Sequence, residues 1–149
     1  LDIKSDSFID GHQIKEEKHQ IEDLTHRILS ATFNDRQMVQ LPHVYRSLVE
    51  LEVASDYTMY YYNKLGFRAG TCTPFLFYDL DYEIQTPLKI YPYQIMDFAL
   101  LKHVSFLDKK ETLLKAISEV QKVNGSFTFI FHNYSLKYFL NIETVFCNF

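Results

Sequence analysis

Amphipathic helix patterns alternate with short β-prone runs along this chain, and that alternation limits its fold more than any other feature. The clearest pair is residues 108–123, with apolar side chains at three- and four-residue spacing, followed by the almost continuously apolar run 127–131. Asn124 and Gly125 separate the two and favour a left-handed helix end. Alternating helices and strands predict an α/β fold with mainly parallel strands.

Two more helices are predicted in the first third of the chain. Residues 10–30 have a helical period, with Asp10 as the expected N-cap. The side chains expected on the buried face are Ile14, Ile21, Leu24 and Ile28. Pro42 is expected to open the next helix, because a proline in the first turn lacks only an N–H that would be unpaired. The expected buried stripe of that helix is Val44, Tyr45, Leu48 and Leu51.

The middle of the chain has a less regular pattern. Residues 57–62 are aromatic and β-prone, and we expect a strand there. Residues 66–87 show no clear period and are predicted to form a long ordered loop, a kind of segment that often carries function. Residues 88–96 are predicted to form a strand in which Pro92 indicates an edge position or a bulge. Asp108 and Glu111 are expected to cap the helix that follows.

Composition excludes several classes of function. The chain has 149 residues, enough for one domain, with 15 basic and 19 acidic side chains and no basic stripe. A nucleic-acid partner is therefore not expected. No apolar run approaches the roughly 20 residues of a membrane span, so none is predicted. Cys72 and Cys147 form no paired motif, and the chain begins at Leu1 without a signal peptide, so the sequence leaves the compartment open.

Aromatic residues are unusually frequent, with 11 tyrosines, 13 phenylalanines and no tryptophan. Such a composition indicates a large core or a surface that packs against a partner. The densest group could stack on sugar rings, although core packing accounts for most of it. Its members are Tyr57, Tyr60, Tyr61, Tyr62, Phe67, Phe75, Phe77 and Tyr78.

Three polar residues occur where chemistry is expected. Arg68 lies between two glycines on the predicted loop, where its guanidinium would either hold a carboxylate in a site or form a structural ion pair. Asp97 follows one predicted strand and would either orient a base or cap a helix at Phe98. His132 follows another strand and would serve as a general acid or as a structural histidine.

Other histidines give no metal site. His12, His19 and His26 recur every seven residues on the first predicted helix. Steps of that length are too far apart for one ion, so the stripe is interpreted as a solvated face.

Several segments in the same order resemble the later part of a polysaccharide deacetylase domain of the NodB-like class, and more narrowly a subgroup with a GFRAGT signature. The resemblance extends over about residues 36–133. The matching segments are SDYTM (55–59), GFRAGT (66–71), PF (74–75), FYDL (77–80), YQIMD (93–97) and FHN (131–133).

The resemblance implies a fold, a reaction and roles for the three polar residues. The fold would be an incomplete (β/α) barrel of mostly parallel strands, with 1–149 forming one partial domain. In the family a divalent metal, usually zinc, activates water for attack on the N-acetyl carbonyl of a glycan. Arg68 would orient the catalytic base, Asp97 would be the supporting carboxylate, and His132 would be the general acid.

The chain also departs from the family at the metal and base. The strand with the family's paired aspartates would precede Leu1, so the N-terminal strands of the barrel are expected to be missing. Residues 5–8 read SDSF where relatives carry a histidine, and Met38 stands where a histidine is expected. Residues 134–149 also depart from the family's pattern. No metal ligand is therefore assigned in this chain.

Two functions remain open from the sequence. The first is a deacetylase-like domain that is degenerate or inactive in this chain. The alternative is a non-catalytic module that binds an N-acetylated glycan or assembles with other chains. Strand edges left bare by missing strands would favour a homo-oligomer.

Overall fold

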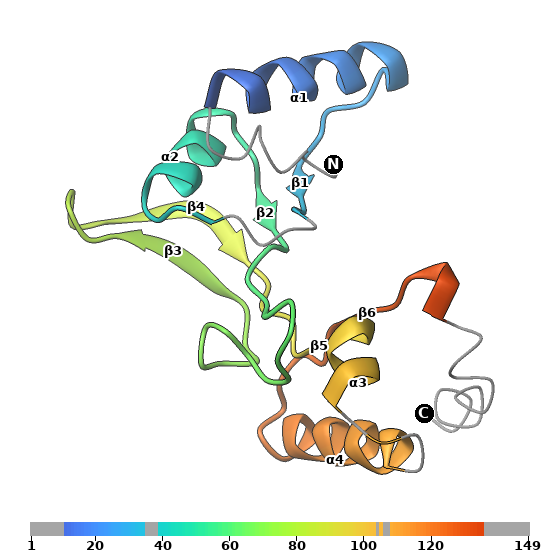
Figure 1. Cartoon of the computed structure of the whole chain (residues 1–149). Coiled ribbons are helices and arrows are strands. Elements are labelled where there is room, and N and C mark those ends of the chain that lie inside the picture. Colours follow the sequence, from blue (N-terminus) through green and yellow to red (C-terminus); the bar gives the residue numbers. More distant parts are fainter. Residues whose placement is uncertain (1–10, 35–38, 104, 106–107, 136–149) are drawn as a thin grey trace. The chain divides into compact units, whose positions relative to one another are not determined.

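The computed structural model describes residues 11–34, 39–103, 105 and 108–135 (Figure 1). Contacts divide the chain into two compact units. The first unit comprises residues 1–59 and 74–92, and the second comprises residues 60–73 and 93–149. Whether these units form one partial domain of the family, as the resemblance implies, stays a prediction. No helix within the described ranges is long and apolar enough to cross a membrane.

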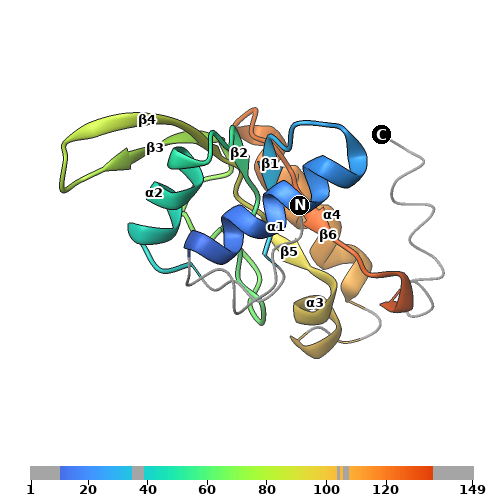
Figure 2. The same cartoon turned by 90° about the horizontal axis from the view of Figure 1, so that it is seen from above.

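The first unit contains a four-stranded sheet of order β1-β2-β4-β3. Its strands are β1 (Ala31–Thr32), β2 (Ser55–Asp56), β3 (Phe75–Asp79) and β4 (Ile84–Ile90). β1 pairs with β2 and β2 with β4 in parallel, whereas β3 and β4 form an antiparallel hairpin, and Figure 2 shows these two strands side by side. The described sheet is thus mostly parallel and does not close into a barrel, and its two edges are β1 and β3.

Two helices accompany this sheet. Helix α2 (His43–Glu50) begins directly after Pro42 as predicted and buries Val44, Tyr45 and Leu48. Helix α1 (Gly11–Thr25) is shorter than predicted. It ends because His26 takes a left-handed φ of 52° and the N–H of Leu29 turns back to the Glu22 carboxylate.

The predicted buried face of the first helix is wrong at two of its four positions, Leu24 and Ile28, whereas Ile21 is half-buried. Ile14 is buried, but Leu24 and Ile28 are 82% and 86% exposed. Ile28 lies beyond the end of α1, so the helical period that grouped it with Ile14 does not apply there. The predicted N-cap, Asp10, lies outside the described residues.

The predictions for the middle of the chain need three corrections. Residues 66–87 are not one loop, because β3 and the first part of β4 fall within them. The period of β3 was hidden because apolar side chains occupy both its faces: Phe77 is buried, whereas Leu76 and Tyr78 are exposed. The predicted strand over 88–96 is two strands separated at Pro92. The strand predicted over 57–62 is wrong, because β2 ends at Asp56 and residues 57–62 form no strand.

The second unit contains a short parallel pair and two helices. The strands are β5 (Ile95–Met96) and β6 (Phe129–Ile130), and the helices are α3 (Asp97–His103) and α4 (Lys109–Lys122). Its core is formed by Ile95, Leu100, Leu113 and Ile117. The helix predicted over 108–123 and the strand predicted over 127–131 are thus confirmed. Asn124 takes the expected left-handed φ of 51°.

The predicted capping of α4 by side chains is wrong. Asp108 precedes the helix in a helical conformation and makes no side-chain cap hydrogen bond. Its carboxylate instead accepts a hydrogen bond from the hydroxyl of Ser105. Glu111 lies in the first turn, where its charge favours the helix N-terminus.

An ion pair ties the β3–β4 turn to α2. Arg46 donates from Nη2 to Asp79 at 2.7 Å and to Asp81 at 2.6 Å, and its Nε lies 2.5 Å from Asp79. The Asp79 carboxylate is buried and also accepts the backbone N–H of Asp81. Hydrogen bonding from Arg46 lowers the pKa of Asp79 to about 2, although burial opposes the shift.

We therefore predict that Asp79 contributes to acid unfolding. A lowered pKa in the folded state gives stability that is complete above the unfolded pKa of about 3.9 and is lost as the pH falls toward 2. Asp79→Asn should lose less stability than the wild type between pH 4 and pH 2, measured by urea unfolding at each pH. Asp23→Asn on the exposed side of α1 should keep the wild-type slope. Equal slopes for Asp79→Asn and the wild type would contradict the prediction.

Candidate functional site

The parallel pair of the second unit brings two of the three predicted site residues into contact. Met96 pairs with Ile130, and both strands end there (Figure 1). Asp97 directly follows the first strand and His132 lies just beyond the second. His132 Nδ1 is 2.9 Å from Asp97 Oδ1 and 3.1 Å from Oδ2. The carboxyl ends of the two parallel strands thus bring Asp97 and His132 into contact. Any chemical role of either residue depends on this contact.

Asp97 is held as a buried carboxylate. Its side chain has no exposed surface, and it accepts the backbone N–H of Phe98 and that of His132, each at 2.7 Å. Burial acts to raise the pKa of Asp97, but hydrogen bonds from Ser135, from the His132 N–H and from the His132 ring outweigh it and lower the pKa. The Ser135 hydroxyl also donates to the His132 carbonyl at 2.7 Å. Because it has one proton, it donates either to this carbonyl or to Asp97 at any one time. Asp97 thus accepts the first N–H of α3 and also contacts the His132 ring, whereas its role in orienting a catalytic base stays a prediction.

The His132 ring is fixed in one orientation. Its Nδ1 faces Asp97, and Tyr134 stacks on it with ring centroids 5.0 Å apart and an angle of 19° between the planes. The side chain is 28% exposed. A ring that donates from Nδ1 to a carboxylate has Nε2 as its reactive nitrogen, which accepts a proton when neutral and donates one when charged. This arrangement suits general acid or base chemistry at Nε2.

Arg68 belongs to the same unit, in the Gly66–Gly70 turn. Gly66 and Gly70 take φ values of 107° and 70°, which favour glycine, and the N–H of Gly70 closes the turn onto the Phe67 carbonyl. Arg68 is half-buried there. That it orients a catalytic base stays a prediction.

The described residues do not form the metal site that the resemblance implies. Within the described ranges there is no group of three or more His, Cys, Asp or Glu side chains that could hold a metal ion. Both oxygens of Asp97 are instead engaged by protein donors, Oδ1 by Phe98 and Oδ2 by His132. Residues 5–8 and Met38, where the resemblance implies histidines, lie outside the described part. His12 and His19 have exposed side chains, as the interpretation of a solvated face predicts.

The sequence did not indicate a buried polar cluster in the first unit, centred on Asp56 at the end of β2. Asp56 is completely buried and accepts hydrogen bonds from the hydroxyls of Thr32 (3.2 Å), Tyr45 (3.1 Å) and Thr58 (2.7 Å), and from the Thr58 N–H (3.0 Å). Burial raises the pKa of Asp56, against these hydrogen bonds, which lower it. Asp56 precedes the run predicted as a strand, so the signal that singled out Asp97 was missing, and only its place in the SDYTM segment (55–59) marks it.

Comparison of the chain with protein-family models, with curated proteins and with solved structures finds no match. The resemblance to polysaccharide deacetylases therefore stays a prediction.

Proposed function

We propose that this chain is a polysaccharide deacetylase-like domain in which His132, oriented by Asp97, is the proton donor for hydrolysis of an N-acetyl group on a glycan. The observation that carries the proposal is the 2.9 Å contact between His132 Nδ1 and a fully buried Asp97 carboxylate. The order of the matching segments supports it as well, since both residues fall within motifs that resemble the family.

The chemistry needs a proton at the departing nitrogen. An amine leaves an amide only when it is protonated, and an imidazole is the side chain best suited to give that proton near neutral pH. Asp97 would hold Nδ1 and stabilise the charged ring, so that Nε2 presents the proton to the substrate. Tyr134, stacked on the ring and 56% exposed, would limit the ring's rotation and offer a face to a sugar.

The proposal covers the proton-donating half of the reaction alone. Because the described donor set does not fit a divalent metal, no step is derived through one. We therefore propose that without added metal the described residues bind glycan and release no acetate.

The alternative is a glycan-binding module without a catalytic role. The exposed Tyr134 ring beside His132 favours it, because an aromatic face next to a hydrogen-bonding group is a common way to hold a sugar. Both functions predict binding near His132, and acetate release in the presence of added Zn²⁺ separates them.

The test is a titration of the chain with N-acetylglucosamine tetramer, with and without added Zn²⁺, followed by NMR and by an acetate assay. We expect the tetramer to shift the ring signals of His132 and Tyr134, and His132→Ala to weaken binding about tenfold. The matched control is His12→Ala, which removes an exposed histidine of α1 and should bind as the wild type does.

Each outcome decides something. If the wild type releases acetate and His132→Ala does not, the proton-donor role is supported and the proposal that this domain is inactive is overturned. Acetate released equally by His132→Ala would refute that role. Failure of the tetramer to perturb either ring would overturn the glycan proposal as a whole.

A further inference from the structure

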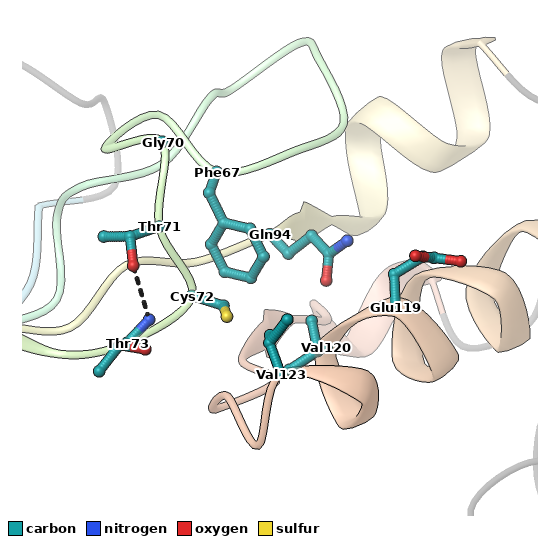
Figure 3. Close-up of a pocket in the computed structure, with 9 residues that line it drawn as sticks. All are labelled: Phe67, Gly70, Thr71, Cys72, Thr73, Gln94, Glu119, Val120 and Val123. Carbon is teal, nitrogen blue, oxygen red and sulfur yellow. Dashed lines mark hydrogen bonds between the residues drawn. The ribbon is translucent and has the colours of Figure 1, made fainter.

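The cavity drawn in Figure 3 has a volume of about 540 Å³ and lies between the loop over residues 67–73 and the last turns of α4. Its polar lining groups are already engaged or out of reach. The Glu119 carboxylate pairs with Lys122 Nζ at 2.7 Å, and Gln94 Oε1 is buried beneath the surface. These groups select no ligand, whereas a cavity beside β3 in the first unit has a wall that does identify an occupant.

β3 leaves one edge of its sheet unpaired. It pairs with β4 on one side, and no strand of the described residues lies on its other side. Leu76 pairs with Lys89 and Tyr78 with Gln85, so the register shift adds its extra residues to β4 and β3 continues without interruption. A strand edge presents N–H and C=O groups to another strand, and natural edges are usually blunted by Lys, Pro or bulges. Residues 75–79 read FLFYD and contain no Lys or Pro.

A cavity of about 330 Å³ lies beside the second half of this strand. Its lining consists of Leu41, Pro42 and residues 77–81. Arg46 Nη2 donates to the two acidic side chains in that lining, to Asp79 at 2.7 Å and to Asp81 at 2.6 Å, so their charges are already paired. A cavity of about 150 Å³ is large enough for benzene, so this one can receive an aromatic side chain.

The chain itself carries a side chain suited to that cavity. Phe75, at the start of β3, is 37% exposed, whereas Phe77 and Asp79 on the same face of the strand are buried. Residues directly opposite each other in paired strands have their side chains on one face of the sheet. If a second copy of β3 pairs antiparallel with full overlap, Phe75 of one copy lies opposite Asp79 of the other, which lines the cavity. A two-fold axis makes this contact twice, because each copy provides one Phe75 and one cavity.

The other side chains of β3 are compatible with this self-pairing. Antiparallel strands place the uncharged start of one β3 against the Asp79 end of the other, whereas parallel strands would set two Asp79 carboxylates side by side. Leu76 and Tyr78, which are 39% and 48% exposed, would lie opposite each other on the second face. Both faces of the joined strands would therefore cover apolar surface that one copy leaves in water.

We propose that this chain forms a two-fold dimer in which β3 of each copy pairs antiparallel with β3 of the other and each Phe75 ring enters the other copy's cavity. The surface belongs to the first unit, so the dimer goes beyond the proposed function and does not depend on His132. The contact is isologous and closes on itself, so it ends at two copies. Because an interface of two short strands is small, the dissociation constant is expected to be about micromolar or weaker.

The test combines sedimentation of the whole chain, over concentrations up to about 1 mM, with amide hydrogen exchange. The wild type should pass from monomer to dimer as its concentration rises. The outward-facing N–H groups among residues 75–79 should then exchange more slowly, because pairing gives them acceptors. A dimer that leaves these N–H groups unprotected would be held by another surface and would overturn the proposal. A chain that stays monomeric would also overturn it, and would leave the edge to a strand of a different protein.

Two variants test the two parts of the contact. Phe75→Ala removes the ring and should weaken dimerisation about tenfold. Tyr78→Lys places a charge on the edge strand and should weaken it by about the same factor or more. Both side chains are partly exposed, so the variants should fold, as urea unfolding at a concentration where the wild type is monomeric would show. Leu24→Ala, which removes an 82% exposed side chain of α1, should dimerise as the wild type does. Unchanged dimerisation in Phe75→Ala or in Tyr78→Lys would contradict the proposed interface.

Discussion

Replacing Asp97 with alanine is expected to lower the free energy of unfolding by about 2–5 kcal/mol and to free the His132 ring from its fixed orientation. The loss is large because the carboxylate is fully buried and accepts the N–H groups of Phe98 and His132 as well as the ring. Without it the N–H of His132 loses its acceptor, as does the N–H at the start of α3. Urea unfolding measures the first effect.

The imidazole ¹⁵N shifts measure the second effect. In the wild type the proton of the neutral ring should reside on Nδ1, where it is donated to Asp97. Asp97→Asn should lose this preference, because an amide places an NH₂ against an N–H of His132 or Phe98 whichever way it is turned. The ring should then carry its proton on Nε2 in a larger fraction of molecules, and the nitrogen that would act on a substrate changes from acceptor to donor.

A matched control uses an aspartate of the same unit. Asp108 receives a hydrogen bond from Ser105 but no N-cap bond, and it is exposed. Asp108→Ala should change the free energy of unfolding by no more than about 0.5 kcal/mol. If Asp97→Ala were as mild as Asp108→Ala, or if its ring kept the Nδ1 proton, Asp97 would not orient His132.

The contact between Asp97 and His132 was predictable in outline from the sequence. Each residue follows a β-prone run, and parallel strands place the residues beyond their carboxyl ends at one edge of a sheet. The sequence could not show that Asp97 would accept the N–H groups of both Phe98 and His132, because the second contact joins residues 35 positions apart. Tyr134 and Ser135, which complete the surroundings of His132, carry no period or motif that marks them.

The wrong predictions about the fold have a common physical cause. Side chains with apolar character were assigned to a buried face, but Leu24, Ile28 and Tyr78 are exposed. A sequence period shows which residues share a face, and it cannot show whether another element covers that face. For the same reason β3, apolar on both faces, was interpreted as part of a loop.

The second large effect is expected at Asp56 and has the opposite dependence on pH from that of Asp79. Burial raises the pKa of Asp56, so the folded state keeps a proton that the unfolded state has already released. Its contribution to stability is complete below the unfolded pKa of about 3.9 and is lost as the pH rises through the folded value. Asp56→Ala should cost about 2–4 kcal/mol at pH 4, because the Tyr45 hydroxyl and the Thr58 N–H lose their acceptor, and this cost should become smaller as the pH rises.

Asp56→Asn separates charge from hydrogen bonding. Its oxygen can take the place of Oδ2 and accept the Tyr45 hydroxyl and the Thr58 N–H, while its NH₂ donates to the Thr32 and Thr58 hydroxyls, which can rotate to accept. This variant keeps the bonds but cannot ionise. Its stability relative to the wild type should therefore rise between pH 4 and pH 7, as followed by urea unfolding. A constant difference across that range would mean that Asp56 is charged in the folded state, with four neutral donors sufficient to hold a buried carboxylate.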